Sequence, residues 1–364
     1  MPGQAQVLGD GPGPPRPHQR ARRRQLCDQE DGARLRHVGN IGRMESGPEL
    51  SVVLVNHNGA RCLPATLDAL ALGTVEPRVE CLVVDSGSHD GSWRGVERHW
   101  AAARPLRIDE NVGFCTACDA GARAAHGRLL AFVNFDGCVE PGWDRPLRTL
   151  LDEDPEVSVA TGLLLRKDGQ TIEAAGLEIA PNMATYGRLE GAPRQSAPSA
   201  PLDVAAASGA LMMVRREEFL ALGGFYEPIF MFGEEADYCL RVPGRIVLDS
   251  RSAIRHEMGH AAGPTRSRLR LYYPARNRLV NAARHLPPLA MMRAVATSAA
   301  FDLVTLATVR RLDAVGAVFR GWMEGLRAMP SERRARGPSE RRRAARRLAS
   351  LREAVAQQRR LGRL

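Results

Sequence analysis

Between Glu49 and Asp136, short apolar runs rich in β-branched residues alternate with segments of helical pattern. The apolar runs cover residues 50–55, 79–84, 105–108 and 129–133, and helices are expected at 63–72, after residue 92 and up to residue 125. Continuous apolar runs of this length are typical of strands buried on both faces of a sheet. Strands that alternate with helices join through right-handed crossovers. The sequence therefore predicts an α/β domain with a mostly parallel sheet flanked by helices.

Polar residues mark the ends of these predicted strands. Asn56, Asp85, Asn111 and Asp136 come at or shortly after the four apolar runs. In a parallel sheet the carboxyl ends of the strands lie at one edge, and ligands bind there. We therefore expect these four residues to lie together at a ligand site. For Asp85 taken alone, a turn-forming role at a strand end is the alternative.

A later segment, residues 208–241, places three carboxylates within four residues. It reads SGALMMVRREEFLALGGFYEPIFMFGEEADYCLR, in which a strand-like run, a short helical segment and an aromatic loop precede Glu234, Glu235 and Asp237. Like charges this close together are unfavourable unless a cation or a proton-transfer step uses them. The alternative is a solvated helix start, where acids favour the positive end of the helix dipole.

The positive charge of the chain is concentrated at its two ends. The 364 residues carry a formal net charge of +10. Residues 1–44 contribute +4, with eight Arg against four acids, and residues 331–364 contribute +9, with twelve Arg against three Glu, so the middle carries −3. The length fits one large α/β domain with a smaller appendage. Seven scattered Cys without a signal peptide predict reduced thiols.

Residues 1–46 are predicted to be a disordered basic extension. Their Pro-, Gly- and Arg-rich sequence has no apolar periodicity, and it lacks the apolar core of a secretory signal. Patterned sequence begins only after Met44, which is a candidate translation start. The alternative is a basic arm that contacts membrane or nucleic acid.

Five motifs in this order resemble those of a known enzyme family. They are VVLVNHNG, VVDSGSHDGS, NVGFCTACDAGARAA, LAFVNFDG and the acidic segment described above. Over residues 50–281 the chain resembles a family 2 glycosyltransferase of the GT-A fold, close to the rhamnosyltransferase-like branch. IRH at 254–256 and YYPARN at 272–277 also resemble closing elements of that branch. The resemblance implies a Rossmann-like nucleotide-diphospho-sugar transferase architecture, followed here by a C-terminal helical appendage.

The resemblance also implies which residues bind a nucleotide-diphosphate sugar. Asp85 and Asp90 match the position that contacts the base or ribose. Asp136 matches the last residue of the family's DxD element, where Mg²⁺ or Mn²⁺ bridges the protein to both phosphates. Asn134 replaces the first acid of that element, and His256 is a further candidate metal ligand. The implied donor-binding set is completed by strand-end and loop residues, namely Asn56, Asn111, Gly113 and Asn134.

Glu235 matches the position of the catalytic base in the same family. Inverting transfer needs a carboxylate within hydrogen-bond reach of the acceptor hydroxyl. Asp237 is the second candidate catalytic residue, and its alternative is a structural pairing with Arg241 at i+4 spacing. The division of roles among Glu234, Glu235 and Asp237 stays open at this point. Asp119 stands where the family usually has Asn.

Two further motifs match sites of other protein classes. Residues 256–260 read HEMGH and match the HExxH pattern of zinc peptidases, which requires a helix to bring both His side chains to one face. Gly259, Gly263 and Pro264 argue against a helix there. Cys115 and Cys118 form a CxxC pair with no partner pair, so we interpret them as packing residues.

The C-terminal third has a different character. Residues 286–309 are apolar but interrupted by Arg293 and Asp302, which argues against a membrane span. Residues 309–329 predict an amphipathic helix, either at a membrane interface or packed on the catalytic domain. A basic helical tail follows, which suits anionic lipid better than nucleic acid because it has no base-reading motif. The predicted parts of the chain are an extension (1–46), a GT-A catalytic domain (47–285), an amphipathic helical region (286–330) and a basic tail (331–364).

Together these features predict an inverting, cation-dependent glycosyltransferase, peripheral at the cytoplasmic face of the cell membrane. The predicted donor is a nucleotide-diphosphate sugar such as dTDP-rhamnose, and the predicted acceptor is a hydroxyl of a cell-envelope glycan or a lipid-linked molecule. The alternative is a non-catalytic sugar-nucleotide-binding or scaffolding protein of the same fold. The presence of Asp85, Asp136 and Glu235 favours the enzyme.

Overall fold

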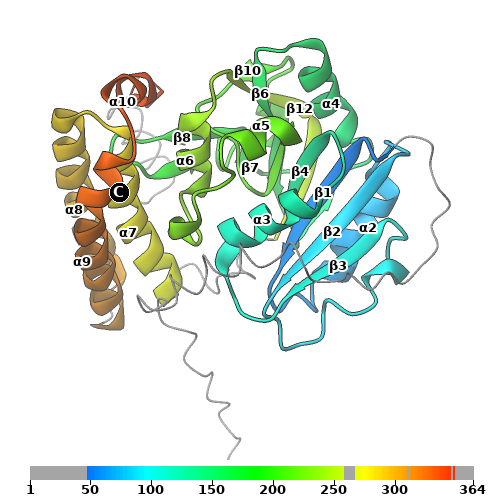
Figure 1. The fold of residues 1–364 in the computed structure, drawn as a ribbon, viewed down its shortest axis with the longest axis horizontal. Coiled ribbons are helices and arrows are strands. Elements are labelled where there is room, and N and C mark those ends of the chain that lie inside the picture. The colour runs from blue at the N-terminus through cyan, green and yellow to red at the C-terminus, as the bar shows by residue number, and fades with distance from the viewer. Residues whose placement is uncertain (1–46, 258–266, 310–311, 346, 349–364) are drawn as a thin grey trace, which may run out of the picture. The chain divides into compact units, whose positions relative to one another are not determined.

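The computed structural model describes residues 47–257, 267–309, 312–345 and 347–348 (Figure 1). The chain divides into two units, residues 1–46 and 47–364, and the first lies outside the described residues. The predicted N-terminal extension therefore stays a prediction. The second unit contains both the α/β domain and the C-terminal helices, so the helical appendage belongs to the same compact unit as the sheet.

A ten-stranded sheet forms the centre of the described part of the chain. Its main path runs β10-β12-β6-β11-β4-β1-β2-β3, with β5 paired to β12 and β7 paired to β6. A separate two-stranded sheet joins β8 and β9. The strands span Leu50–Asn56 (β1), Val79–Ser86 (β2), Ala103–Ile108 (β3), Leu129–Asn134 (β4), Gly137–Val139 (β5), Val157–Arg166 (β6), Ile172–Ala174 (β7), Leu177–Ile179 (β8), Thr185–Gly187 (β9), Leu202–Asp203 (β10), Leu211–Arg215 (β11) and Arg245–His256 (β12).

The sheet is mostly parallel, as predicted. β1 pairs in parallel with β2 and β4, β2 pairs in parallel with β3, and β12 pairs in parallel with β6. β11 lies between β6 and β4 in the sheet and runs antiparallel to both of them. Val52, Val53 and Leu54 of β1 are buried because the strand is central and covered on both faces. This burial explains why the apolar run is continuous rather than alternating.

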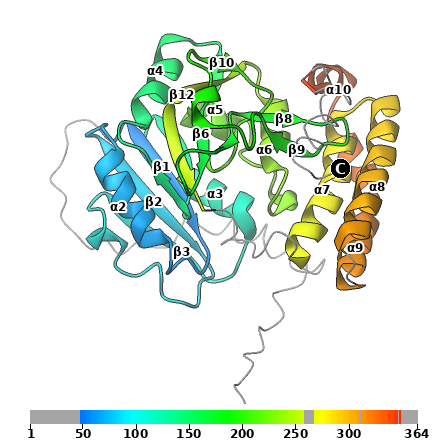
Figure 2. The same ribbon diagram turned by 180° about the vertical axis from the view of Figure 1, so that it is seen from behind.

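Helices cover both faces of the sheet. In Figures 1 and 2, α2 and α3 lie on opposite faces of β1 and β2. The helices of this part are α2 (Leu63–Gly73), α3 (Gly113–Ala124), α4 (Asp144–Glu153), α5 (Arg216–Ala221) and α6 (Glu234–Arg241). The helix expected after residue 92 is replaced by a loop and a short 3-10 helix at Val96–Arg98. Gly91 and Gly95 have φ of +75° and +72°, and such left-handed residues interrupt a right-handed helix.

Among the C-terminal helices of the described residues, α7, α8 and α9 lie side by side, and α10 lies near one end of this row (Figure 1). These helices are α7 (Arg268–His285), α8 (Pro288–Val309), α9 (Leu312–Arg334) and α10 (Pro338–Ala345). α9 packs closely against α7 at Gly321. A Cβ added at this glycine would lie 2.6 Å from the carbonyl oxygen of Tyr272. Arg293 and Asp302 do not interrupt α8. Among the described residues, α8 contains the one helical stretch, Pro288–Thr308, that is long and apolar enough to cross a membrane.

α9 continues across the boundary predicted at residue 331 and ends at Arg334. Glu332 is buried and accepts hydrogen bonds from Tyr226 Oη at 2.8 Å and Arg284 Nη1 at 3.0 Å. Arg347 donates to the backbone carbonyl oxygens of Cys239 and Gly244. The first half of the predicted basic tail is therefore packed on the catalytic domain. The interpretation as a tail is left with residues 349–364, which lie outside the described residues.

Glu332→Ala is expected to destabilise the protein by about 3 kcal/mol, because it removes one partner from the buried Arg284 guanidinium and the Tyr226 hydroxyl. In thermal unfolding this corresponds to a fall in Tm of roughly 5–10 °C. The matched control is Glu153→Ala in α4, where the side chain is exposed and a change within about 0.5 kcal/mol is expected. Equal Tm values for the two variants would contradict the packing described here.

Candidate active site

The carboxyl ends of the parallel strands come together, as predicted. Asn56 lies opposite Asp85 in the pairing of β1 with β2, and its side-chain Nδ2 donates to Asp85 Oδ1 at 2.7 Å. Asn111 reaches the same edge, where its Oδ1 lies 3.4 Å from Ser86 Oγ. Gly87, with φ of +64°, permits this approach, because an added Cβ would lie 2.6 Å from the backbone nitrogen of Asn111.

Asp85 is fully buried, and both of its carboxylate oxygens have protein partners. Oδ1 accepts from Asn56, while Oδ2 accepts from the backbone N–H of Ser88 at 3.2 Å and forms an ion pair with Arg107 of β3. The structure therefore gives Asp85 a positioning role, in place of the direct contact with base or ribose that the resemblance implied. The Arg107 guanidinium also lies 4.9 Å from the centre of the Trp93 ring.

Asp90 remains exposed at the rim of the same edge. Its carboxylate accepts hydrogen bonds from the N–H and hydroxyl of Ser92 and from the N–H of Ala60. Partial burial opposes ionisation, but these hydrogen bonds outweigh it and hold the pKa of Asp90 below its ordinary value. Asp90 thus ties the loop after β2 to the loop after β1, and it keeps an accessible negative charge.

A second cluster forms where β4 and β12 end. His256 Nε2 lies 3.1 Å from Asp136 Oδ1 and 3.2 Å from Asn134 Nδ2. On its other side, His256 Nδ1 lies 3.0 Å from Oε1 of Glu173 in β7. Burial lowers the pKa of His256, but the hydrogen bonds to Asp136 and Glu173 outweigh it and raise the pKa to about 10. The structure thus brings Asn134, Asp136 and His256 together from two strands far apart in the sequence.

This cluster fits a divalent cation if the protein supplies only some of the ligands and the substrate supplies the others. No group of three or more His, Cys, Asp and Glu side chains suited to a metal is present in the described part of the chain. Asp136 supplies one carboxylate, and His256 would supply an imidazole nitrogen once a bound cation displaced the proton that its raised pKa retains. Mg²⁺ usually takes one or two protein carboxylates, with the remaining positions filled by phosphates and water. Glu173 holds the Nδ1 side of the imidazole, as carboxylates do for metal-binding histidines.

Arg270, near the start of α7, approaches the same cluster. Burial lowers the pKa of Arg270, and the negative charges of Asp136 and Glu173 partly offset this effect. Its guanidinium also lies 5.5 Å from the centre of the Phe232 ring, in the loop before the acidic segment. The sequence did not predict that Arg270 would lie near the predicted metal ligands, because its position depends on how α7 packs.

α7 also holds the loop that precedes the acidic segment. Asn277 Nδ2 lies 2.8–3.0 Å from the carbonyl oxygens of Ile229, Met231 and Phe232, and Asn281 donates to that of Gly233 at 2.9 Å. The loop needs such support because two of its non-glycine residues, Phe230 and Phe232, have φ of +68° and +65°. These contacts give the YYPARN motif a physical role in positioning the start of α6.

The two glutamates at the start of α6 are not a solvated helix end. Glu234 is buried, and its Oε2 has no hydrogen-bond partner. Glu235 keeps partial exposure, and its carboxylate accepts from Thr185 Oγ1 at 2.9 Å and from the N–H of Gly233 at 3.1 Å. Burial raises the pKa of both carboxyl groups, and the charge of Glu235 raises that of Glu234 further. We therefore assign the shared proton to Glu234 and the accessible carboxylate to Glu235.

Asp237 has a structural role, so its prediction as a second catalytic carboxylate is corrected. It is fully buried, and its oxygens contact Arg241 Nε, Arg284 Nε and His285 Nε2, each at 2.8 Å. Burial alone would raise the pKa of Asp237, but these positively charged and donating neighbours hold it well below its ordinary value. The i+4 pairing with Arg241 is confirmed. A carboxylate enclosed in this way cannot reach an acceptor.

Asp119 is a buried carboxyl group that accepts a hydrogen bond from the N–H of Phe225 at 2.9 Å. Burial, which this hydrogen bond only partly offsets, raises the pKa of Asp119 from its ordinary value of 3.8 to about 7. Because the folded-state pKa is raised, the group lowers stability as pH rises from about 4 to about 7. The residue lies beside Gly224, at the start of the loop that leads to α6.

Asp119→Asn is therefore expected to stabilise the protein at about pH 8 by roughly 2–4 kcal/mol, while changing little at about pH 4. Asn keeps an oxygen that accepts from Phe225 but carries no charge. Urea unfolding at both pH values measures the effect, with the exposed Glu153→Gln as control. A gain that is the same at both pH values would show that the charge of Asp119 is not its cause.

Neither alternative metal motif forms a site in the described part of the chain. His256 lies at the end of strand β12 rather than on a helix, and His260 lies outside the described residues. His256 therefore does not belong to a helical HExxH motif of the zinc-peptidase kind. Cys115 and Cys118 are buried in the hydrophobic core, as predicted.

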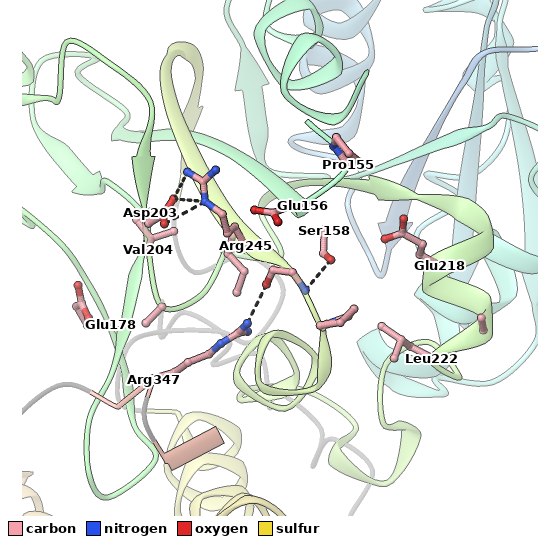
Figure 3. Close-up of a pocket in the computed structure, with 15 residues that line it drawn as sticks. Pro155, Glu156, Ser158, Glu178, Asp203, Val204, Glu218, Leu222, Arg245 and Arg347 are labelled. Carbon is pink, nitrogen blue, oxygen red and sulfur yellow. Dashed lines mark hydrogen bonds and ion pairs between the residues drawn. The ribbon is translucent and has the colours of Figure 1, made fainter. Parts of the chain in front are cut away.

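A large cavity lies at the opposite end of the strands. It has a volume of about 970 Å³ and is lined by residues at the start of β6 and β12, including Glu156, Ser158 and Arg245 (Figure 3). Arg245 pairs there with Asp203, and Arg347 donates to Gly244. Because parallel α/β sheets bind ligands at the carboxyl ends of their strands, we do not place the active site in this cavity.

A mostly parallel sheet with a polar carboxyl edge and an acidic helix beside it is the arrangement of the GT-A fold. Residues 51–219 match the model of the glycosyl transferase family 2. Over these residues the chain is similar to that family. The Myxococcus xanthus O-antigen biosynthesis protein RfbC is 25% identical over 226 residues, which are 57% of this chain and 17% of that protein. The chain spans 17% to 38% of the length of the three curated relatives that it matches.

Solved structures support the fold. The structure of residues 1–349 of S. aureus TarS in complex with UDP-GlcNAc superimposes with a TM-score of 0.55 at 16% identity, covering 79% of this chain and 83% of that one. The structure of GalNAc-T7 with UDP, GalNAc and Mn²⁺ gives a TM-score of 0.50 at 18% identity, covering 66% of this chain and 51% of that one. At these identities the likeness concerns the fold alone.

Proposed function

We propose that the protein is an inverting glycosyltransferase that moves a sugar from a nucleotide-diphosphate donor to a hydroxyl group. The observation that carries this proposal is the state of Glu235. Its carboxylate is partly exposed, has a raised pKa and is held by Thr185 and Gly233 at the start of α6. A general base is most effective when its pKa lies near the working pH.

In the proposed reaction, Glu235 accepts the proton of the acceptor hydroxyl. The acceptor oxygen forms a bond to the anomeric carbon of the donor, and the bond from that carbon to the diphosphate oxygen breaks on the opposite face. The electron pair of the broken bond leaves with the nucleoside diphosphate. Glu234 supports this step by carrying the proton that the pair shares, which leaves Glu235 ionised.

Asp136 and His256 would hold a Mg²⁺ or Mn²⁺ ion, with Asn134 beside them and Glu173 orienting the imidazole. The ion would neutralise the diphosphate as negative charge develops on it. Arg270 would act on the same charge from α7. The presence of Mn²⁺ in the GalNAc-T7 structure supports a cation requirement of this kind.

Asn56, Asp90, Asn111 and Gly113 are proposed to line the donor site, and Asp85 to hold Asn56 and Arg107 in place. The likeness of the motifs to the rhamnosyltransferase-like branch supports dTDP-rhamnose as the first donor to test. The O-antigen relative supports a cell-envelope glycan or a lipid-linked precursor as acceptor and polysaccharide biosynthesis as the process. We place the enzyme at the cytoplasmic face of the cell membrane.

The test is a screen of UDP-, GDP- and dTDP-sugars that measures release of the nucleoside diphosphate, with Mg²⁺, with Mn²⁺ and with excess chelator. We expect release from one donor that depends on the cation. The competing proposal, a non-catalytic sugar-nucleotide-binding or scaffolding protein, predicts donor binding by calorimetry without release under any of these conditions. The raised pKa of Glu235 favours the enzyme over this alternative.

A further inference from the structure

The outward face of α8 is apolar over most of its length, and Arg293 is its exposed charged residue. Only 17% of the apolar window of this helix is buried inside the protein. Its large exposed side chains are Leu289, Met292, Leu303 and Val304, and the exposed Ala296, Ala300 and Ala307 lie between and beyond them. These positions recur every three or four residues, so they lie on one side of the helix. A soluble helix normally exposes its polar side.

α9 has the same unusual character. One side packs on α7 through Ala314, Val318, Gly321 and Gly325. Its exposed large apolar residues are Leu312, Val315, Phe319 and Leu326. These residues also recur at helical spacing, so each of the two helices presents a stripe of apolar side chains away from the protein interior. Contiguous apolar surface of this kind marks an interaction site.

The acidic residues of both helices are turned away from this face. Asp302 pairs with Arg278 of α7 and accepts from Trp322, and Glu332 pairs with Arg284 of α7. The other two acids of α8 and α9 are held in the same way, Asp313 by Arg268 and Glu324 by Tyr272. By contrast, the strongly exposed charged residues of the two helices are all arginines, namely Arg293, Arg320, Arg327 and Arg334.

We propose that the exposed apolar stripes of α8 and α9, here called the α8–α9 face, dock in the plane of an anionic phospholipid bilayer. The apolar side chains would enter the boundary between headgroups and acyl chains, and the arginines would contact the lipid phosphates. A second copy of the same chain fits less well, because a self-complementary contact would bring the same arginines together.

The inner side of α8 argues for lying in the membrane surface rather than spanning it. Ser298 Oγ contacts the carbonyl oxygen of Asn182 at 3.3 Å, and Asp302 is bound to Arg278. These polar contacts tie the middle of the helix to the rest of the protein. A spanning orientation would have to break them in a medium that offers no replacement.

The experiment measures flotation of the full chain with vesicles of phosphatidylcholine containing about 30% phosphatidylglycerol. The test variant is the double substitution Leu303→Glu and Phe319→Glu, one on each helix. We expect its bound fraction to fall by more than about tenfold, because two apolar anchors become charged. The control is Leu72→Glu in α2, where a leucine even more exposed than Leu303 lies outside the α8–α9 face. This control should bind as the unmodified protein does.

Arg320→Gln with Arg327→Gln should weaken binding to the anionic vesicles without adding a negative charge to the apolar stripes, and raised salt should have the same effect. Equal flotation of the unmodified protein and the Leu303→Glu, Phe319→Glu variant would overturn the proposal. The proposal would also be overturned if the unmodified protein bound no vesicles and light scattering showed a dimer that is absent in this variant. Unfolding curves show whether the variants are folded. The assay needs neither donor nor acceptor, so its outcome is independent of the proposed reaction.

Discussion

Glu235→Gln is expected to lower the rate of sugar transfer by about 10²–10⁴-fold, because the amide cannot accept the proton of the acceptor hydroxyl. Gln has nearly the same shape and keeps an oxygen that accepts from Thr185. The nucleotide-sugar donor should therefore bind with nearly unchanged affinity, since the base acts on the acceptor. The measurement is steady-state turnover with saturating donor and acceptor, combined with calorimetric binding of the donor.

The pH dependence of the same reaction gives a second readout. Glu235 must be ionised to act as base, and burial raises its pKa above 4.5. Activity should therefore rise with pH through a pKa above that ordinary value and then level off. The Glu235→Gln variant should lack this rise, because the group that titrates has been removed. A rise that persists in the variant would assign the titration to another residue.

Asp237→Asn is the matched control two residues along the same helix. Because Asp237 is buried between Arg241, Arg284 and His285, its loss should destabilise the fold by about 3–5 kcal/mol. The protein that remains folded at low temperature should still turn over. If Asp237→Asn were folded but inactive, and Glu235→Gln were active, the base would be Asp237 and the assignment made here would be wrong.

Asp136→Ala is expected to lower cation-dependent transfer by about 10³-fold or more, because the ion that neutralises the diphosphate would lose its carboxylate ligand. The same variant should bind Mn²⁺ and the nucleoside diphosphate more weakly when both are present. Calorimetry and the electron paramagnetic resonance signal of free Mn²⁺ measure this directly, without turnover. Unchanged Mn²⁺ affinity would place the cation elsewhere.

Glu173→Gln distinguishes a ligand from a residue that orients a ligand. Glu173 contacts His256 Nδ1, on the opposite side of the ring from the Nε2 atom that meets Asp136, so we expect Mn²⁺ affinity to fall by about 10–100-fold, less than for Asp136→Ala. Asp168→Asn is the matched control, because its exposed carboxylate caps a nearby turn through Thr171. It should leave Mn²⁺ affinity unchanged. Equal losses for Glu173→Gln and Asp136→Ala would make Glu173 a direct ligand.

The sequence by itself determined the first half of the sheet and the edge at which its polar residues meet. The apolar runs that became β1, β2, β3 and β4 are local signals, because strand burial on both faces requires several apolar residues in succession. The same holds for the i+4 pair of Asp237 and Arg241, which lies within one helix. The helix predicted after residue 92 does not form, because Gly91 and Gly95 have left-handed backbone conformations.

Only the tertiary structure decided what the individual site residues contact. Glu173 meets His256 from 83 residues away, and Thr185 meets Glu235 from 50 residues away. Such contacts have no local pattern, since they depend on how distant strands pair. The different roles of Glu235 and Asp237 have the same cause. The two acids lie in one short segment, but the packed helices bury Asp237 and leave Glu235 accessible. For α8 and α9, the sequence carried the apolar residues, but packing on α7 determined which of them stay exposed.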